Sequence, residues 1–234
     1  MAYKIRKPDL MLIKILDKTY SLISHPNLIN LNKDYYYLDI PKSGSSFVRS
    51  SIIKDGNSII NISNKYPHSA LFKRTLYWNS IDQKKIISFI RDPVERFCSV
   101  VRQKMMNKKF SKEGWNPSKF PWSGKLYTLS NVNQLINDFI NLPFNQTDKH
   151  IIPQSIFIKK YSKNDNLKIF HVSNMSKILL EIGISESSFP DDKISLKTDS
   201  NLFNINNLSN NSIGLLKSYY SEDYKLLEKL HTNL

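Results

Sequence analysis

Residues 37–47 read YLDIPKSGSSF, and this stretch decides the fold of the chain. It overlaps a compact β-prone run over residues 35–40, which ends at Pro41. A short segment rich in serine and glycine comes next, and residues 47–53 then resume the apolar spacing of a helix. The pattern predicts a strand, a loop and a helix in succession.

The loop of this unit has the composition of an anion-binding turn. Gly44 lets the backbone approach an oxyanion closely, and successive N–H groups can surround it while Ser45 and Ser46 donate further hydrogen bonds. Lys42 adds a mobile positive charge, which suits an oxygen that becomes negative as a leaving group. The alternative is a polar turn that binds nothing.

The same unit recurs at residues 87–99, which read ISFIRDPVERFCS. An apolar strand ends at Arg91, and Ser99 lies about two turns into the helix that follows. Arg91 offers a planar, permanently charged group suited to a phosphate monoester, and Ser99 offers a hydroxyl. Alternatively, Arg91 simply pairs with Glu95 or Asp92 at the start of the helix.

Strands and helices alternate along the rest of the chain. The spacing predicts helices over residues 10–24, 132–140, 175–181 and 213–230, short strands over 156–158 and 167–172, and irregular structure over 108–128. This alternation predicts an α/β layered fold with a largely parallel sheet. We expect a single domain over residues 1–234, with a helical extension at 1–30 and the core at 31–234.

The composition allows one core and favours an anionic partner. The chain has 234 residues, of which 40% are hydrophobic, and this suits one domain of the larger single-domain size. Lys and Arg number 34 against 20 Asp and Glu, so the formal charge is +14. Nucleic acid, anionic lipid, a nucleotide cofactor and an acidic polysaccharide all fit that charge, as does a generally basic surface.

Cysteine and hydropathy exclude further classes of protein. Cys98 is the only cysteine, so an intramolecular disulfide and a thiolate metal cluster are both excluded. The apolar stretch at residues 10–16 is interrupted by Lys14 and is too short to span a bilayer. We therefore expect a cytoplasmic protein without a transmembrane segment.

Together the two motifs resemble the nucleotide-binding loops of the sulfotransferase superfamily, especially the branch that sulfates carbohydrates. The resemblance runs from residue 34 to residue 104, with a weaker similarity in HIIPQ at 150–154 and in the helix after His171. It implies a P-loop-NTPase-like three-layer α/β fold with a central, mainly parallel sheet. It also implies transfer of a sulfuryl group from 3′-phosphoadenosine 5′-phosphosulfate (PAPS) to an acceptor hydroxyl, with 3′-phosphoadenosine 5′-phosphate (PAP) as product.

The resemblance also assigns residues to the donor. In that family the first loop holds the 5′-phosphosulfate, which maps onto Lys42, Ser43, Gly44, Ser45, Ser46 and Phe47. The second segment holds the 3′-phosphate, which maps onto Arg91 and Ser99. No spacing of cysteine, histidine and carboxylate residues predicts a metal site, and we expect none.

Two histidines are candidates for the base that removes the acceptor proton. His68 lies between the two loops, which resembles where carbohydrate-sulfating relatives place a catalytic histidine, and we expect it to be the base. His150 resembles another family segment near acceptor and donor, and we expect it to contact substrate or serve as a second base. Some members of the superfamily use a glutamate, but Glu95 fits a helix start better.

The acceptor is expected to be a carbohydrate or another hydroxyl-bearing molecule, neutral or acidic. Aromatic residues alternate with lysines over residues 104–125 and could stack on sugar faces, form a plain surface loop or contact nucleic acid. A P-loop-like kinase is one rival function, but the only Gly-Lys pair, at 124–125, is followed by Leu126. A basic nucleic-acid-binding module is the other, supported by charge and this loop alone, and we expect no nucleic-acid partner. The sequence carries no signal for an oligomeric state.

Overall fold

The structure, a computed structural model, describes residues 24–56, 58–60, 71–72, 74–76, 84–106, 114–118, 125–190 and 202–231. These residues fall into two compact units, each discontinuous in sequence. One comprises the described parts of Met1–Ile40, Gly44–Phe89 and Tyr161–Ile194. The second unit comprises the described parts of Pro41–Ser43, Ile90–Lys160 and Ser195–Leu234. Most of the helix predicted over residues 10–24 lies outside the described residues.

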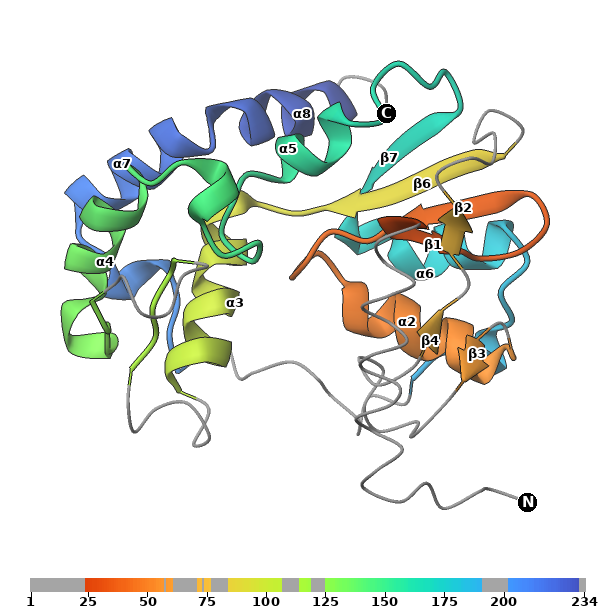
Figure 1. The fold of residues 1–234 in the computed structure, drawn as a ribbon, viewed down its shortest axis with the longest axis horizontal. Helices are drawn as coiled ribbons and strands as arrows, with labels where there is room; N and C mark the ends of the chain where they lie inside the picture. Colours follow the sequence, from red (N-terminus) through yellow and green to blue (C-terminus); the bar gives the residue numbers. More distant parts are fainter. Residues whose placement is uncertain are drawn as a thin grey trace. The chain divides into compact units, whose positions relative to one another are not determined.

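The first unit is built on a sheet that has five strands in the described residues, in the order β5-β1-β2-β6-β7 (Figure 1). The strands are β1 (Ser24–Asn30), β2 (Tyr35–Leu38), β5 (Arg74–Leu76), β6 (Lys85–Ile90) and β7 (Leu167–His171). Strands β3 (Ser58–Ile60) and β4 (Leu71–Phe72) form a separate antiparallel pair.

The sheet is mainly parallel, as the sequence predicts. Strands β2 and β6 pair in parallel with Tyr37 opposite Ile87, whereas β1 is antiparallel to both β2 and β5. The N–H of Ile86 donates to the carbonyl of Asn166, so β6 and β7 begin side by side. Strands β5, β2, β6 and β7 therefore share one direction, and β1 opposes them.

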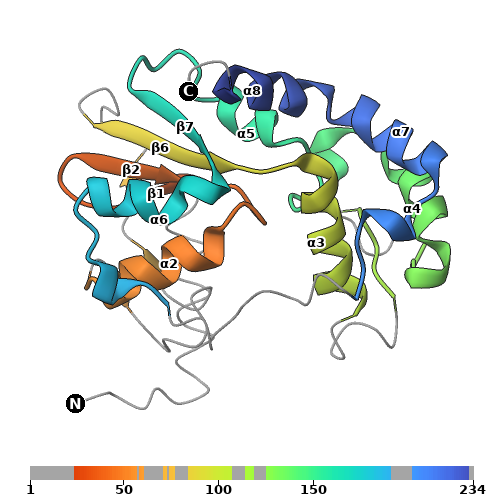
Figure 2. The ribbon, with the colours of Figure 1, turned by 180° about the vertical axis from the view of Figure 1, so that it is seen from behind.

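Two helices of the first unit, α2 (Ser45–Lys54) and α6 (Met175–Glu181), lie on the same side of the sheet (Figures 1 and 2). Val48 and Ile52 of α2 pack with Leu179 of α6 against Tyr37 and Phe89 of the sheet. All five side chains are buried. Strand β6 is buried at five of its six positions, from Ile86 to Ile90.

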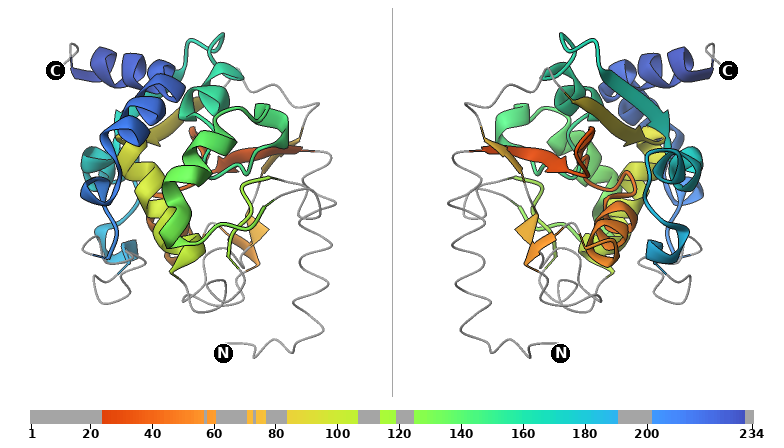
Figure 3. Two further views of the ribbon diagram at one scale, coloured as in Figure 1. Left: turned by 90° about the vertical axis from the view of Figure 1, so that its left-hand side faces the viewer. Right: turned by 90° about the vertical axis from the view of Figure 1, so that its right-hand side faces the viewer.

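The second unit is helical in its described residues (Figure 3). Its helices are α3 (Pro93–Met105), α4 (Val132–Phe139), α5 (Gln154–Lys159), α7 (Asn210–Tyr219) and α8 (Ser221–His231). Phe97 of α3, Phe139 of α4 and Leu216 of α7 share one buried core, and the two phenylalanine rings stack with centroids 5.6 Å apart. Short 3-10 helices occupy Leu129–Asn131, Phe144–Gln146, Val172–Asn174, Glu186–Ser188 and Ile205–Asn207.

The structure confirms the α/β class, the two strand-loop-helix units, the strand over residues 167–171, and the helices at 132–139 and 175–181. The strand predicted over residues 156–158 is wrong, since these residues lie in α5. The carboxylate of Asp223 accepts the N–H groups of Gln154 and Ser155, each at 2.8 Å, and so caps a helix there. A run of three apolar residues fits either structure, and this distant carboxylate decides for the helix.

Two further elements differ from the sequence prediction. Residues 24–30, expected in a helical extension, form β1. The single helix expected over residues 213–230 is divided into α7 and α8 at Tyr220. The ring of Tyr220 is buried and its hydroxyl donates to the carbonyl of Ile151 at 2.6 Å, so this long-range contact fixes the break.

Candidate active site

The backbone of the first loop is held in a left-handed turn. Lys42 has a φ of 68° and Gly44 a φ of 83°, and Lys42 is the only non-glycine residue with a positive φ in the part of the chain that the structure describes. The left-handed conformation costs a residue with a side chain about 1–2 kcal/mol. The fold therefore stores strain at the residue predicted to act on the leaving group.

Gly44 begins helix α2 and leaves the N-terminus of that helix open. It is the N-cap residue, no side chain caps the helix, and the first turn contains no acidic residue. A Cβ atom at Gly44 would come within 2.0 Å of the Cε atom of Met175, so the position is tightly packed as well as left-handed. The positive end of a helix with no capping side chain favours an anion.

The hydroxyl groups of this loop hold the loop itself. Ser43 is fully buried, and its hydroxyl donates to Oε1 of Gln154 at 2.7 Å. The hydroxyl of Ser45 donates to the carbonyl of Ile40 at 2.7 Å. The ring of Phe47 packs on Phe189 with centroids 5.3 Å apart. Ser43 and Ser45 are thus already engaged as donors, which leaves their main-chain N–H groups as the candidate contacts to a ligand.

The second loop presents Arg91 with part of its hydrogen-bonding capacity unused. Its Nη2 atom donates to Glu95 at 2.9 Å, which is the pairing that the sequence left open. The Glu95 side chain is 65% exposed, however, so this ion pair contributes little. The Nε atom of Arg91 is buried and has no hydrogen-bond partner among the residues that the structure describes. A buried donor without an acceptor is costly, and an anionic ligand would satisfy it.

Gln154 joins the two loops within the second unit. Its amide accepts from the Ser43 hydroxyl and from the Arg91 N–H at 3.1 Å, and it donates to the Arg91 carbonyl at 2.9 Å. Gln154 is fully buried, and so is Asp223, which bonds its main-chain N–H. Neither residue has a role predicted from the sequence motifs, although Gln154 lies in the HIIPQ segment that resembles the family.

Arg96 is a third residue for which the sequence motifs predicted no role. Its side chain is completely buried on α3 and donates to main-chain carbonyls of Pro41 and Ile152, each at 2.9 Å, with a longer contact of 3.5 Å to Lys149. The sequence feature that could have indicated a role for Arg96 is its place as the second arginine of the RDPVER segment, in a helix that is buried on nearly every side. A polar side chain on such a helix has to find partners inside the unit.

Lys42 lies in a strongly positive environment. Burial, followed by the charges of Arg91, Arg102, Lys104 and Arg96, lowers the pKa of Lys42 to about 8. Three of these four cations are carried by α3, as is Ser99, which is largely buried. The second unit therefore gathers like charges that repel one another until an anion binds among them.

His150 forms a dyad with Asp148. Nδ1 of His150 lies 2.6 Å from Oδ1 of Asp148, which also accepts the His150 main-chain N–H at 2.9 Å, and Lys104 lies 3.5 Å from the other oxygen. Although burial opposes it, His150 and Lys104 hold the pKa of Asp148 well below its usual range. Burial lowers the pKa of His150 despite the carboxylate, so the ring is neutral near pH 7. With Nδ1 donating to Asp148, Nε2 carries the lone pair.

The other predicted acceptor residues are only partly described. His68 lies outside the described residues, as do the aromatic residues Phe120 and Trp122. The loop between α3 and α4 is irregular where it is described, and Trp115 pairs with Tyr127 in an isolated antiparallel bridge. No helix in the described ranges is both long and apolar enough to cross a bilayer, and these ranges contain no cluster of three potential metal ligands.

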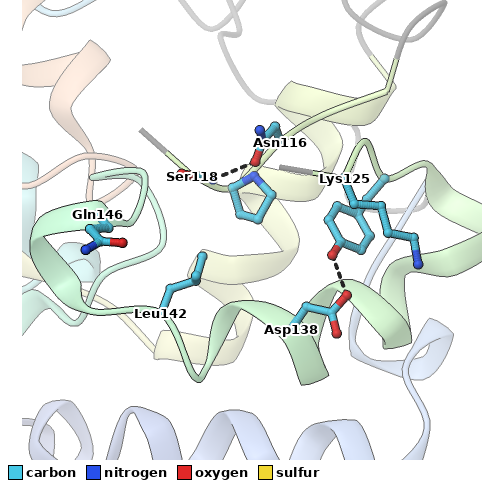
Figure 4. Close-up of a pocket in the computed structure, with 8 residues that line it drawn as sticks. Asn116, Ser118, Lys125, Asp138, Leu142 and Gln146 are labelled. Carbon is cyan, nitrogen blue, oxygen red and sulfur yellow. Dashed lines mark hydrogen bonds between the residues drawn. The ribbon is translucent and has the colours of Figure 1, made fainter. Parts of the chain in front are cut away.

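A pocket of about 320 Å³ lies beside this bridge (Figure 4). It is lined by Asn116, Pro117, Ser118, Lys125, Tyr127, Asp138, Leu142 and Gln146. The Tyr127 hydroxyl donates to Asp138, and the Ser118 N–H donates to the Asn116 side chain at 2.9 Å. One wall adjoins the dyad, because the Asp148 N–H donates to the Pro117 carbonyl at 2.7 Å.

Comparison with known families identifies the class of protein. The model of the sulfotransferase family matches residues 25–229, which span both units and both loops. The chain belongs to the sulfotransferase family, and it is an enzyme of the transferase class. No curated protein and no solved structure matches it.

Proposed function

We propose that this enzyme transfers a sulfuryl group from PAPS to a hydroxyl of a carbohydrate. Membership of the family establishes sulfuryl transfer as the type of reaction. The donor, the acceptor class and the residue roles are the proposal. The observation that carries it is the group of cations around Lys42, which a polyanionic nucleotide would neutralise.

The residues of the second unit fit such a donor. The buried Nε of Arg91 has no acceptor, and a phosphate monoester would supply one in the geometry that a guanidinium prefers. Ser99 lies on α3, which begins two residues after Arg91, and its hydroxyl could add a contact to that 3′-phosphate. Lys42 and the N–H of Ser43 would meet the 5′-phosphosulfate. Residues 44–47 continue the chain directly from Ser43 and, by resemblance, serve the same group.

PAPS supplies the sulfuryl group, and its sulfur–oxygen bond to the phosphate breaks as the acceptor oxygen bonds to sulfur. Lys42 would stabilise the negative charge that collects on the phosphate oxygen, because it lies in the loop that the resemblance assigns to the 5′-phosphosulfate. Its pKa of about 8 leaves most of the ammonium protonated at pH 7.

His150 accepts the acceptor's hydroxyl proton at Nε2, and Asp148 stabilises the imidazolium that forms. This role makes His150 a full candidate for the base, whereas the sequence favours His68. Both histidines are proposed as candidates for the base, and substituting each in turn distinguishes between them.

The pocket next to the dyad supports a carbohydrate acceptor. A carboxylate, two amides and a lysine line it, and such groups hydrogen-bond to the many hydroxyls of a sugar. Its volume of about 320 Å³ is at the lower end of the range typical of small-molecule sites. We assign one sugar residue of the acceptor to this pocket.

The donor is tested by comparing two nucleotides in a thermal-shift assay. PAP should raise the melting temperature well above the shift given by adenosine 5′-phosphate, because only PAP carries the 3′-phosphate for Arg91. Arg91→Ala should abolish the difference between the nucleotides. Lys217→Ala, which removes an exposed cation from α7, serves as the control and should preserve it. Equal shifts for both nucleotides with the unmodified enzyme would rule out PAPS as donor.

The base is tested with His68→Ala and His150→Ala against a panel of oligosaccharides and radiolabelled PAPS. Loss of the base should lower kcat by about 10²–10⁴-fold while the PAP shift persists. Loss of a substrate contact should chiefly raise the KM of the acceptor. The variant with the kcat defect identifies the base, and near-normal kcat in both would exclude a histidine.

A further inference from the structure

Arg96 contacts the main chain on both sides of the proposed chemistry. Its Nε donates to the Pro41 carbonyl, which directly precedes Lys42. Its Nη atoms reach the carbonyls of Lys149 and Ile152, which bracket His150. All of these residues belong to the second unit. One side chain therefore connects the segment that carries the proposed leaving-group cation with the segment that carries a proposed base.

The chemistry of these contacts is unusual for a buried arginine. The side chain is 0% exposed, and in the described part of the chain no carboxylate lies within ion-pair distance of it. A buried charge without such a partner is destabilising unless its donors are all well used. Three nitrogen atoms of Arg96 donate to main-chain carbonyls. These hydrogen bonds compensate the buried charge only while the segment at Pro41 and the segment around His150 keep their positions.

Geometry makes arginine specific at this position. Carbonyls from two separate segments are engaged by one planar group with donors on three nitrogen atoms. A lysine would keep the charge, but its single ammonium cannot span both segments in the same way. Arg96→Lys therefore separates the effect of charge from the effect of position.

We propose that Arg96 is a positioning residue that fixes Lys42 and His150 relative to each other through the main chain of their two segments. It touches neither donor nor acceptor. The inference rests on the proposed function, since it takes Lys42 and His150 as the acting groups.

A positioning role predicts a particular kinetic pattern. Arg96→Lys should lower kcat by about a hundredfold, because a displacement on the order of 1 Å between catalytic groups has an effect of that size. The KM for PAPS and the PAP thermal shift should change little, because Arg91 is untouched. Arg96→Gln, which also removes the charge, should show the same pattern with a larger loss of melting temperature.

The decisive experiment is a pair of double-mutant cycles. Arg96→Lys is combined with Lys42→Ala and, separately, with His150→Ala, and kcat is measured with one oligosaccharide acceptor. If Arg96 acts through these residues, Arg96→Lys should lower kcat by about tenfold or less in each background, because one of the two side chains that Arg96 positions has already been removed. Losses that multiply fully in both cycles would overturn the proposal.

The matched control is Tyr220→Phe. It removes the buried hydrogen bond from the Tyr220 hydroxyl to the Ile151 carbonyl, in the segment that carries His150, and leaves the Arg96 hydrogen bond to Pro41 in place. This variant should lower the melting temperature and combine with Lys42→Ala without coupling. If Tyr220→Phe couples to Lys42→Ala as strongly as Arg96→Lys does, the loss of kcat reflects general stability and the proposal is overturned. Failure of both Arg96 variants to fold would also overturn it. An unmodified enzyme without sulfuryl transfer from PAPS would instead refute the proposed function.

Discussion

The two strand-loop-helix units of this chain begin alike and end differently. After β2, the loop uses two left-handed residues, and Gly44 leaves the N-terminus of α2 without a side-chain cap. After β6, the backbone is ordinary and the side chain of Asp92 caps α3 by accepting the Glu95 N–H at 2.8 Å. The same local plan therefore leaves one helix end open and closes the other.

The difference assigns two modes of anion binding. An open helix end with a strained lysine beside it can bind through main-chain N–H groups and a point charge. A capped helix has no such end to offer, so the proposed binding by its loop depends on a side chain, and the buried Nε of Arg91 is a donor without a partner among the described residues. Each mode fails in its own way when it is altered.

Among substitutions in the two loops, the largest effect is expected from Lys42→Ala. Removing the charge that stabilises the leaving oxygen should lower kcat by about 10²–10³-fold, while the PAP thermal shift falls only slightly. Single-turnover assays with radiolabelled PAPS measure this loss. A weaker PAP affinity with kcat unchanged would reduce Lys42 to a simple phosphate contact.

The same residue should give the alkaline limb of the pH profile. Lys42 acts while protonated, so kcat/KM should fall as pH rises through about 8, the pKa of Lys42 in the free enzyme. If His150 is the base it acts while neutral, so its pKa sets the acid limb of the same profile. Lys104→Gln removes a cation that lowers the pKa values of both Lys42 and His150, so both the alkaline and the acid limb should move to higher pH. A limb that moves to lower pH would contradict this electrostatic account.

Gly44→Ala tests the open helix end. A left-handed alanine costs about 1–2 kcal/mol of stability, and here its Cβ would also meet Met175. Gly56→Ala is the matched control, because Gly56 has a similar φ of 79° with nothing within 4 Å of the added Cβ. Chemical denaturation should show a larger loss for Gly44→Ala, and PAP binding should weaken in that variant alone. Equal losses would mean that the packing around Gly44 is irrelevant.

Asp92→Ala tests the closed helix end. Loss of the cap should cost about 1 kcal/mol of stability, and Asp92→Asn should recover most of it because an amide oxygen also accepts the N–H. PAP binding should persist in both, since Arg91 and not the helix end is the binding group. Abolished PAP binding in the stable Asn variant would show that the two loops bind alike.

The smallest effect belongs to Glu95→Gln. In the proposed complex the carboxylate would compete with the 3′-phosphate for Arg91, and an exposed pair of this kind is worth about 1 kcal/mol at most. PAP should therefore bind up to about fivefold more tightly by calorimetry, whereas adenosine 5′-phosphate should bind unchanged. Weaker PAP binding would mean that Glu95 orients Arg91.

The sequence predicts the elements whose signals are local. Residues 35–40 and 86–90 are β-prone runs that end at a proline or a charged turn, and both become strands of the parallel sheet. Elements that depend on distant partners are missed. Helix α5 depends on Asp223, and the break before α8 depends on a hydrogen bond from Tyr220 to Ile151.

The candidate site follows the same division. Lys42 and Arg91 were predicted because a short motif contains the chemistry that they offer. Gln154 and Arg96 were not, because their hydrogen-bond partners lie 50 or more residues away and, apart from the Ser43 hydroxyl and the Asp223 carboxylate, are main-chain atoms, which every residue type has. The role of Asp148 as the partner of His150 follows only from the structure, which places its carboxylate beside the imidazole ring.

The capping of α5 by Asp223 also bears on how the chain is made. Gln154 precedes its carboxylate partner by 69 residues, an interval on the order of 3–14 s at ordinary rates of translation. Until residue 223 has left the ribosome, the amide groups that begin α5 have no carboxylate to bond. The second unit is therefore expected to mature late, and a nascent chain arrested between these two residues should be open to proteolysis at residues 149–160.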